Sequence, residues 1–156
     1  MGTEILGSRL EGSTLVVETE EGVETYDSRF LVASLLIYVA RGSGQIEPEE
    51  SSLIIDLIEA KFDLEAAESF ELITRALSEL ADKPALGDRL VDLAPTLSDH
   101  DKEDVALMGL KVVAADGQRQ FSEMEQYKRA MTAMGISPEI VHRAFDRYFA
   151  QTMPRD

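Results

Sequence analysis

Apolar residues recur at helical spacing through most of the chain, and only its first part departs from that pattern. There the β-favouring runs Leu15–Thr19 and Val23–Tyr26 flank a Glu-Glu-Gly turn, and Ile5–Leu10 is expected to add a strand before Gly12. Two or three short strands need a surface to pack against. We therefore expect residues 1–27 to form a small hairpin or meander that lies on a helical body or pairs with a neighbouring chain.

From residue 28 onward the periodicity predicts a bundle of about seven helices. Capping residues predict where several of these helices begin. N-caps are expected at Asp27-Ser28, at Ser98 or Asp99, and at Ser122 with Glu125 as its capping-box partner. The expected helices are about 29–41, Pro48 to Phe62, 64–81, 86–93, 99–115, 122–134 and 138–152. The prediction is thus an all-α domain over 28–152, with the β-rich appendage before it and a frayed tail at 153–156.

The same pattern predicts which residues are buried. In the third helix the inward residues are expected to be Ala67, Phe70, Ile73, Leu77 and Leu80. The aromatic residues at helical spacing are interpreted as core or interface rather than as a ligand pocket: Phe62, Phe70, Phe145, Tyr148 and Phe149.

One short unit occurs twice, 73 positions apart. Ser43-Gly44-Gln45 is followed by Glu50, and Asp116-Gly117-Gln118 is followed by Glu123, each glutamate seven positions after the first residue of its unit. Each copy separates two apolar helical runs, and apolar positions coincide between the copies without a gap from Val32/Val105 to Ala60/Ala133. The repeat predicts two related helix–turn–helix units in a compact bundle with an approximate internal twofold.

At these residues the chain resembles the TerB-like family, the helical tellurite-resistance domains of bacteria. Val112–Gly117 with Glu123 looks like that family's Ala-Asp-Gly turn and its downstream acid, and Val39–Glu50 looks like the matching first motif. Ser43 departs from the pattern, because an aspartate is usual there. The resemblance covers about residues 29–150. The resemblance implies an all-helical fold and a link to tellurite or stress-response systems. Related domains occur fused to co-chaperone and membrane-associated proteins. No enzymatic activity is settled for the family.

Composition excludes several classes of function. The chain has no cysteine, so disulfides and thiolate metal sites are excluded. Its net charge of −15 repels phosphate backbones and anionic membrane surfaces, and favours cations and basic protein surfaces. The start lacks the pattern of a signal peptide and the longest apolar run is too short to span a bilayer. We expect a cytoplasmic protein that does not bind nucleic acid or insert into a membrane.

The acidic turns supply the candidate metal ligands. Asp116 and Glu123 are the first choice, followed by Glu50, and then Glu47 and Glu125, since hard cations prefer carboxylate oxygens. A structural interpretation stands beside this one, because Asp before Gly is ordinary turn chemistry and Glu early in a helix favours the dipole. The loop does not have the spacing of an EF-hand.

The two histidines are weaker candidates. His100 lies among acids that begin a helix and is interpreted as an exposed first-turn residue, although a carboxylate-flanked histidine can bind metal. His142 has no evident partner in the sequence. Signatures of a nucleophile, a phosphate loop or a paired-histidine zinc site are absent from the sequence, so no catalytic residue or organic cofactor is predicted.

The leading hypothesis is a non-enzymatic module associated with stress or tellurite resistance. It would bind a protein partner, or a second copy of itself, and a divalent cation through the acidic turns. The alternative is a hydrolytic or other acid–base enzyme that uses carboxylates in a cleft between the two repeats.

Overall fold

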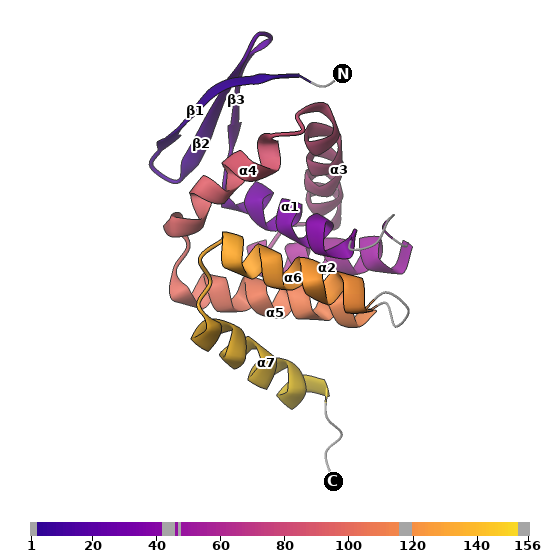
Figure 1. The fold of residues 1–156 in the computed structure, drawn as a ribbon. Helices are drawn as coiled ribbons and strands as arrows, with labels where there is room; N and C mark the ends of the chain where they lie inside the picture. Colours follow the sequence, from indigo (N-terminus) through magenta and orange to yellow (C-terminus); the bar gives the residue numbers. More distant parts are fainter. Residues whose placement is uncertain (1–2, 42–45, 47, 116–119, 153–156) are drawn as a thin grey trace.

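The computed structural model describes residues 3–41, 46, 48–115 and 120–152, and its N-terminal strands and C-terminal helix lie at opposite ends (Figure 1). Three strands, β1 (Ile5–Glu11), β2 (Thr14–Thr19) and β3 (Gly22–Tyr26), precede all the helices. The expected all-helical body with an N-terminal meander is therefore confirmed.

The strands form one antiparallel sheet in the order β1-β2-β3. Leu10 pairs with Leu15, and Leu15 pairs with Tyr26, so apolar side chains from all three strands share a face. Leu15 and Val17 on β2 are fully buried because the sheet rests on the helical body, where β3 contacts the first helix. This supplies the surface that so small a sheet needs.

Seven α-helices and one 3₁₀ segment occupy the rest of the described chain. They are α1 (Ser28–Ala40), α2 (Pro48–Phe62), α3 (Ala66–Asp82), α4 (Leu86–Leu90), η1 (Val91–Thr96), α5 (Asp99–Ala115), α6 (Gln120–Ala133) and α7 (Pro138–Thr152). Helix α1 is the central element: it contacts α2, α3, α5, α6 and η1, and ten of its thirteen residues are buried. Helix α7 packs on α5 at the side of the body far from the sheet (Figure 1).

The two copies of the repeat become two helix pairs, α1–α2 and α5–α6, with matching burial. Val32 and Val105 are both fully buried, and Ile54 and Ile58 in α2 correspond to the buried Tyr127 and Met131 in α6. The pairs pack against each other, since α1 contacts both α5 and α6 while α2 contacts α5. Each copy therefore contributes the same positions to one shared core.

Three expectations at the helix level were wrong in detail. Phe70 is 61% exposed and Ala67 is also exposed, because the inward stripe of α3 runs through Ser69, Ile73 and Ala76 instead. Helix α6 begins at Gln120, so Ser122 lies inside its first turn rather than at its N-cap. The predicted helix at 86–93 ends at Leu90 and continues as the 3₁₀ segment, which contains Pro95.

A polar cluster joins the sheet to α3. The Tyr26 hydroxyl donates a hydrogen bond of 2.8 Å to Glu79, which also pairs with the ammonium group of Lys83. Burial and the contact with Glu79 raise the pKa of Tyr26 to about 12. Although burial alone lowers the pKa of the Lys83 ammonium group, the hydrogen bond to Glu79 holds that pKa above its ordinary value. Glu79 and Lys83 thus form a charged pair, which is enclosed near the junction of β3 and α1.

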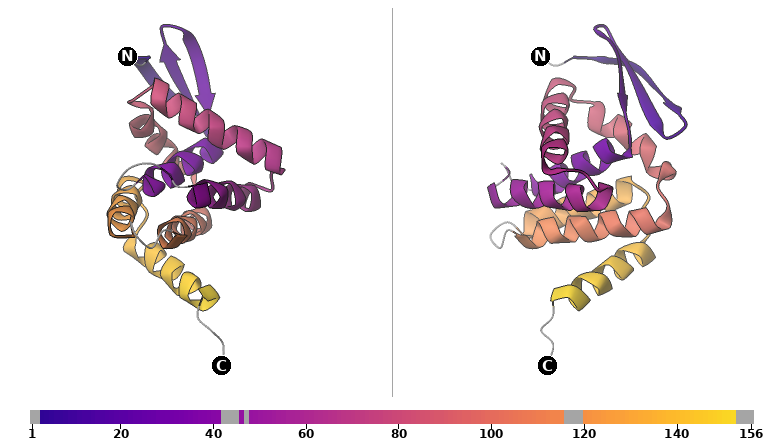
Figure 2. Two further views of the ribbon diagram at one scale, coloured as in Figure 1. Left: turned by 90° about the vertical axis from the view of Figure 1, so that its right-hand side faces the viewer. Right: turned by 180° about the vertical axis from the view of Figure 1, so that it is seen from behind.

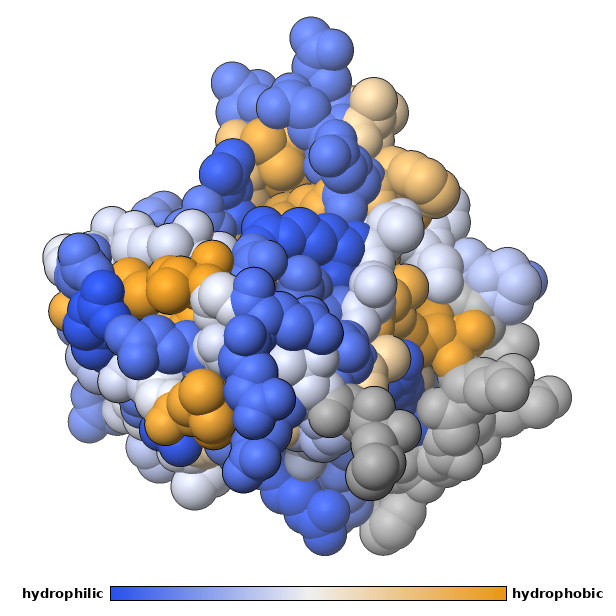
Figure 3. Space-filling model, turned by 90° about the horizontal axis from the view of Figure 1, so that it is seen from above, coloured by the Kyte–Doolittle hydropathy of each residue, from blue (hydrophilic) through white to orange (hydrophobic). Residues whose placement is uncertain are grey.

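None of the described helices is long and apolar enough to cross a membrane. Apolar residues on the face seen from above form separate patches between hydrophilic ones (Figure 3). Leu6, Val23 and Phe70 are the most exposed large hydrophobic residues on the described chain.

Candidate functional site

The four helix ends that flank the repeated turns lie at one end of the body. The last residues of α1 and α5 and the first residues of α2 and α6 face the same direction in both views of Figure 2 and in Figure 1. The turns between them fall mostly outside the described residues. This arrangement places Glu50 and Glu123, in the first turns of α2 and α6, at one end of the molecule.

Glu50 and Glu123 are the only glutamates among the described residues that are fully buried. Each has 0% exposure and lies in the first turn of its helix, Glu50 in α2 and Glu123 in α6. They are equivalent positions of the repeat, so burial of a carboxylate is a property of the unit and not an accident of one copy. Burying a carboxylate is costly, and it persists only where hydrogen bonds, cations or both compensate.

The other candidate ligands divide into two groups. Asp116 and Glu47, together with Ser43, lie outside the described residues. Glu125 is 46% exposed along its side chain and forms an i,i+3 contact of 3.8 Å with Lys128. Glu125 therefore lies on a more solvated face of α6 than the buried Glu123, and the sequence spacing alone could not separate the two.

Among the described residues, no group of three or more histidine or carboxylate side chains is placed to hold a metal ion. A cation site at this end of the body would thus need Glu50 or Glu123 together with groups of the turns themselves. Hydrogen bonds from lysine or arginine side chains lower the pKa of four carboxyl groups, those of Glu79, Asp101, Glu103 and Asp104. A general acid needs the opposite displacement.

Both histidines lie on the surface. His100 is in the first turn of α5, as expected, with its side chain 77% exposed and Nε2 3.4 Å from Asp104. His142 on α7 is 76% exposed and lies 3.5 Å from Asp146. Each is an i,i+4 helical pair.

The described residues contain a second charged cluster, which the sequence did not single out. Lys61 of α2 contacts Asp101 at 2.7 Å and Asp104 at 3.0 Å, both on α5. Arg147 of α7 contacts Asp104 at 2.9 Å and Glu103 at 3.0 Å. The cluster joins α2, α5 and α7 through side chains far apart in sequence, which no local motif could reveal.

This cluster predicts acid sensitivity. The hydrogen bond from Lys61 lowers the pKa of Asp101, and hydrogen bonds from Arg147 and Lys61 lower that of Asp104 despite its burial. A carboxyl group with a lowered native pKa stabilises the fold above its unfolded pKa of about 4, and that contribution is lost as the pH falls through the lower native value. In urea unfolding, the stability difference between the wild type and the double variant K61Q/R147Q should shrink towards zero between about pH 5 and about pH 3.

The matched control is R9Q, which removes the ion pairs of Arg9 with Glu11 and Glu18 on the sheet, where all three side chains are at least half exposed. Such pairs contribute little. If the stability difference between the wild type and K61Q/R147Q stayed constant down to pH 3, it would contradict the assignment of the lowered pKa values of Asp101 and Asp104 to these ion pairs.

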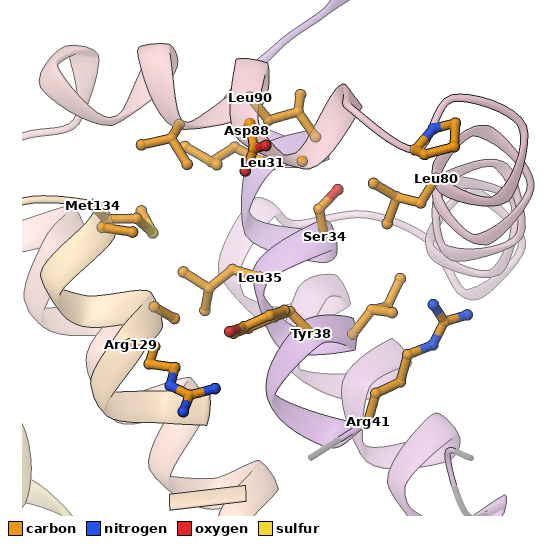
Figure 4. Close-up of a pocket in the computed structure, with 16 residues that line it drawn as sticks. Leu31, Ser34, Leu35, Tyr38, Arg41, Leu80, Asp88, Leu90, Arg129 and Met134 are labelled. Atoms are coloured by element: carbon orange, nitrogen blue, oxygen red, sulfur yellow. The ribbon is translucent and has the colours of Figure 1, made fainter. Parts of the chain in front are cut away.

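Two cavities open between the described helices. One, of about 370 Å³, lies between α1, the end of α3, α4 and α6 (Figure 4). The other, of about 520 Å³, lies between α6 and α7 and is lined by Met124, Met131 and Phe145 among others. Among the described residues, Asp88 is the only carboxylate that lines either cavity, so neither cavity contains Glu50 or Glu123.

Comparison with known proteins agrees with this architecture. The family model "Tellurite resistance protein TerB" matches residues 29–146, from the first turn of α1 into α7. No curated protein and no solved structure matches the chain. The matched stretch covers more than half of the 156 residues, includes both helix pairs and leaves out the sheet. The chain therefore belongs to the TerB tellurite-resistance family.

Proposed function

We propose that this protein is a non-enzymatic, tellurite-resistance-associated module that binds a divalent cation at the end of the body carrying the two acidic turns. The observation that carries the proposal is the full burial of Glu50 and Glu123 at equivalent positions of the repeat. Asp116 is the further ligand that the sequence motif offers beside Glu123.

The chemistry favours a hard cation. Every candidate ligand is a carboxylate, and carboxylate oxygens are what Ca²⁺, Mg²⁺ and Mn²⁺ prefer. The net charge of −15 raises the local concentration of cations around the molecule. The second copy carries the fuller acidic set, Asp116 with Glu123, whereas Ser43 stands at the equivalent place in the first. We expect the second copy to dominate the affinity.

The protein partner is the other half of the proposal. An acidic surface attracts basic protein surfaces, and a cation bound between two turns would set the conformation that a partner meets. The partner is either another protein with a basic face or a second copy of the chain. Sedimentation with and without the bound ion distinguishes self-association from a heterologous partner.

The test of cation binding is a titration of Ca²⁺, Mg²⁺, Mn²⁺ and Zn²⁺ into the protein, followed by calorimetry and amide chemical shifts. At least one ion should bind at or below millimolar concentration and shift the amides of Asp116 and Glu123. E123Q should weaken that ion about tenfold or more, because it removes a charged oxygen ligand, and E50Q should weaken it less.

E125Q is the matched control, since Glu125 lies two residues from Glu123 on the same helix but is half exposed. It should leave the affinity within about twofold. If no ion shifts Asp116 or Glu123, or if E125Q and E123Q weaken binding equally, the cation proposal fails. The carboxylates would then act as helix and turn caps, and E123Q would change stability without any dependence on cations.

A further inference from the structure

The cavity between α1, α3, α4 and α6 has an apolar interior. Most of the residues that line it are apolar, and Leu31, Leu35, Leu90 and Met134 among them are buried. The side chains around the cavity are shown in Figure 4. Its volume of about 370 Å³ is within the range of pockets that enclose small organic ligands.

The charged residues of the lining lie on the surface and apart from one another. Arg41, Arg129 and Asp88 are all exposed. Figure 4 shows the two arginines on either side of Tyr38, and Asp88 on the opposite side of the cavity, near Leu31. Exposed charges that are separated in this way are screened by water and salt, so they do not combine into one site for a charged group.

Among the described residues that line the cavity, Ser34 is the only buried polar side chain. It is 8% exposed and lies on α1 between Leu31 and Tyr38 (Figure 4). Its hydroxyl donates a 2.8 Å hydrogen bond to the carbonyl of Phe30, which uses the one hydrogen that a serine side chain can donate. The oxygen of Ser34 can still accept a hydrogen bond from a ligand, but it has no hydrogen left to give to one.

We propose that this cavity binds a small, uncharged, apolar molecule with a single hydrogen-bond donor, an O–H or an N–H, directed at the Ser34 oxygen. Burial of the apolar part among the leucines supplies most of the affinity, and the hydrogen bond to Ser34 selects donors over acceptors. A charged head is disfavoured, because the buried part of the lining does not compensate for its lost hydration. The site uses none of the carboxylates of the acidic turns and does not depend on cation binding.

The test compares three ligands with one ring system, by calorimetry and by amide chemical shifts of the full chain. Indole carries an N–H, 1-methylindole has a methyl group in place of that hydrogen, and indole-3-carboxylate adds a negative charge. Indole should bind at or below about millimolar concentration, at least about threefold more tightly than 1-methylindole. It should also bind more tightly than the carboxylate, and the shifted amides should lie in α1, α4 and α6.

Ser34→Ala tests the assigned acceptor. Alanine is the better helix former, so the variant should fold, which thermal unfolding checks. It should bind indole and 1-methylindole with affinities within about twofold of each other. Ser69→Ala is the matched control, because Ser69 is also a buried helical serine whose hydroxyl donates to a carbonyl, that of Ile55, but it does not line the cavity. Ser69→Ala should keep the preference for indole.

Ala130→Leu tests the location of the ligand. Ala130 of α6 lines the cavity and is 7% exposed, so a longer side chain there takes up space in the cavity. It should weaken the binding of indole and 1-methylindole alike, by at least about fivefold. The comparison of Ser34→Ala with Ser69→Ala stays decisive even if Ala130→Leu does not fold.

Four results would each overturn the proposal. They are equal affinity of the wild type for indole and 1-methylindole, a preference for indole that survives Ser34→Ala, tighter binding of the carboxylate than of indole, and no saturable binding at millimolar indole. Amide shifts confined to α6 and α7 would overturn it as well, because they would assign the ligand to the second cavity.

Discussion

E79Q should lower the free energy of unfolding by about 3 kcal/mol, because it removes the carboxylate that neutralises an enclosed ammonium group. The Lys83 side chain is 7% exposed and that of Glu79 is 18% exposed, so water cannot replace the lost partner at little cost. The remaining carboxylate, that of Asp82, is 3.5 Å from the Lys83 ammonium and is half exposed. Urea unfolding at neutral pH measures the effect.

A double variant shows whether the charge or the packing is responsible. E79L/K83M replaces both charged groups by apolar ones of similar size, and it should be less destabilised than E79Q because no uncompensated charge stays buried. Y26F removes only the hydrogen bond to Glu79 and should cost about 1 kcal/mol. If the loss of unfolding free energy in E79L/K83M equalled the sum of the losses in E79L and K83M measured singly, Lys83 and Glu79 would act independently.

G109A should destabilise the protein by about 2 kcal/mol, although alanine is the better helix former. A Cβ at Gly109 would lie 2.8 Å and 2.9 Å from two ring carbons of Tyr127, which is too close for unstrained contact. The ring cannot move aside freely, because Tyr127 is 1% exposed and its hydroxyl donates a 2.9 Å hydrogen bond to the carbonyl of Ala106. Helices α5 and α6 would have to separate.

Two comparisons isolate the close contact. G87A makes the same change in α4, where nothing lies within 4 Å, and should be neutral or stabilising by about 0.5 kcal/mol. In a Tyr127→Leu background the ring is gone, so G109A should cost much less than in the wild type. An equal cost of G109A in both backgrounds would locate the strain somewhere other than at Tyr127.

The fold was predictable where the sequence carries a periodic signal. The apolar spacing of the repeat located the shared core of the two helix pairs, because several turns of helix confirm one another, although Tyr38 of α1, expected on the apolar stripe, is 40% exposed. On α3 the prediction placed Phe70 inside, since the pattern favours large apolar residues, whereas the inward stripe uses the small Ser69 and Ala76. Close packing selects small residues there, and Ser69 also donates a hydrogen bond to the carbonyl of Ile55.

The candidate sites were predictable only in part. The equal spacing of Glu50 and Glu123 in the two copies singled them out, and the structure shows that they share full burial. The spacing could not show that Glu125, two residues after Glu123, lies in a more exposed environment. The cavity between α1, α3, α4 and α6 left no local signal, because its lining comes from elements that are separate in the sequence and pack together only in the fold.

The shared core of the two helix pairs also bears on the history of the chain. Because α1 packs on α5 and α6, and α2 on α5, neither pair can bury its apolar face alone. An ancestral unit of one pair would have needed a second molecule to complete the same core, which makes a homodimer the natural precursor. In the present chain both pairs belong to one polypeptide, so the pairs meet intramolecularly, at high effective concentration.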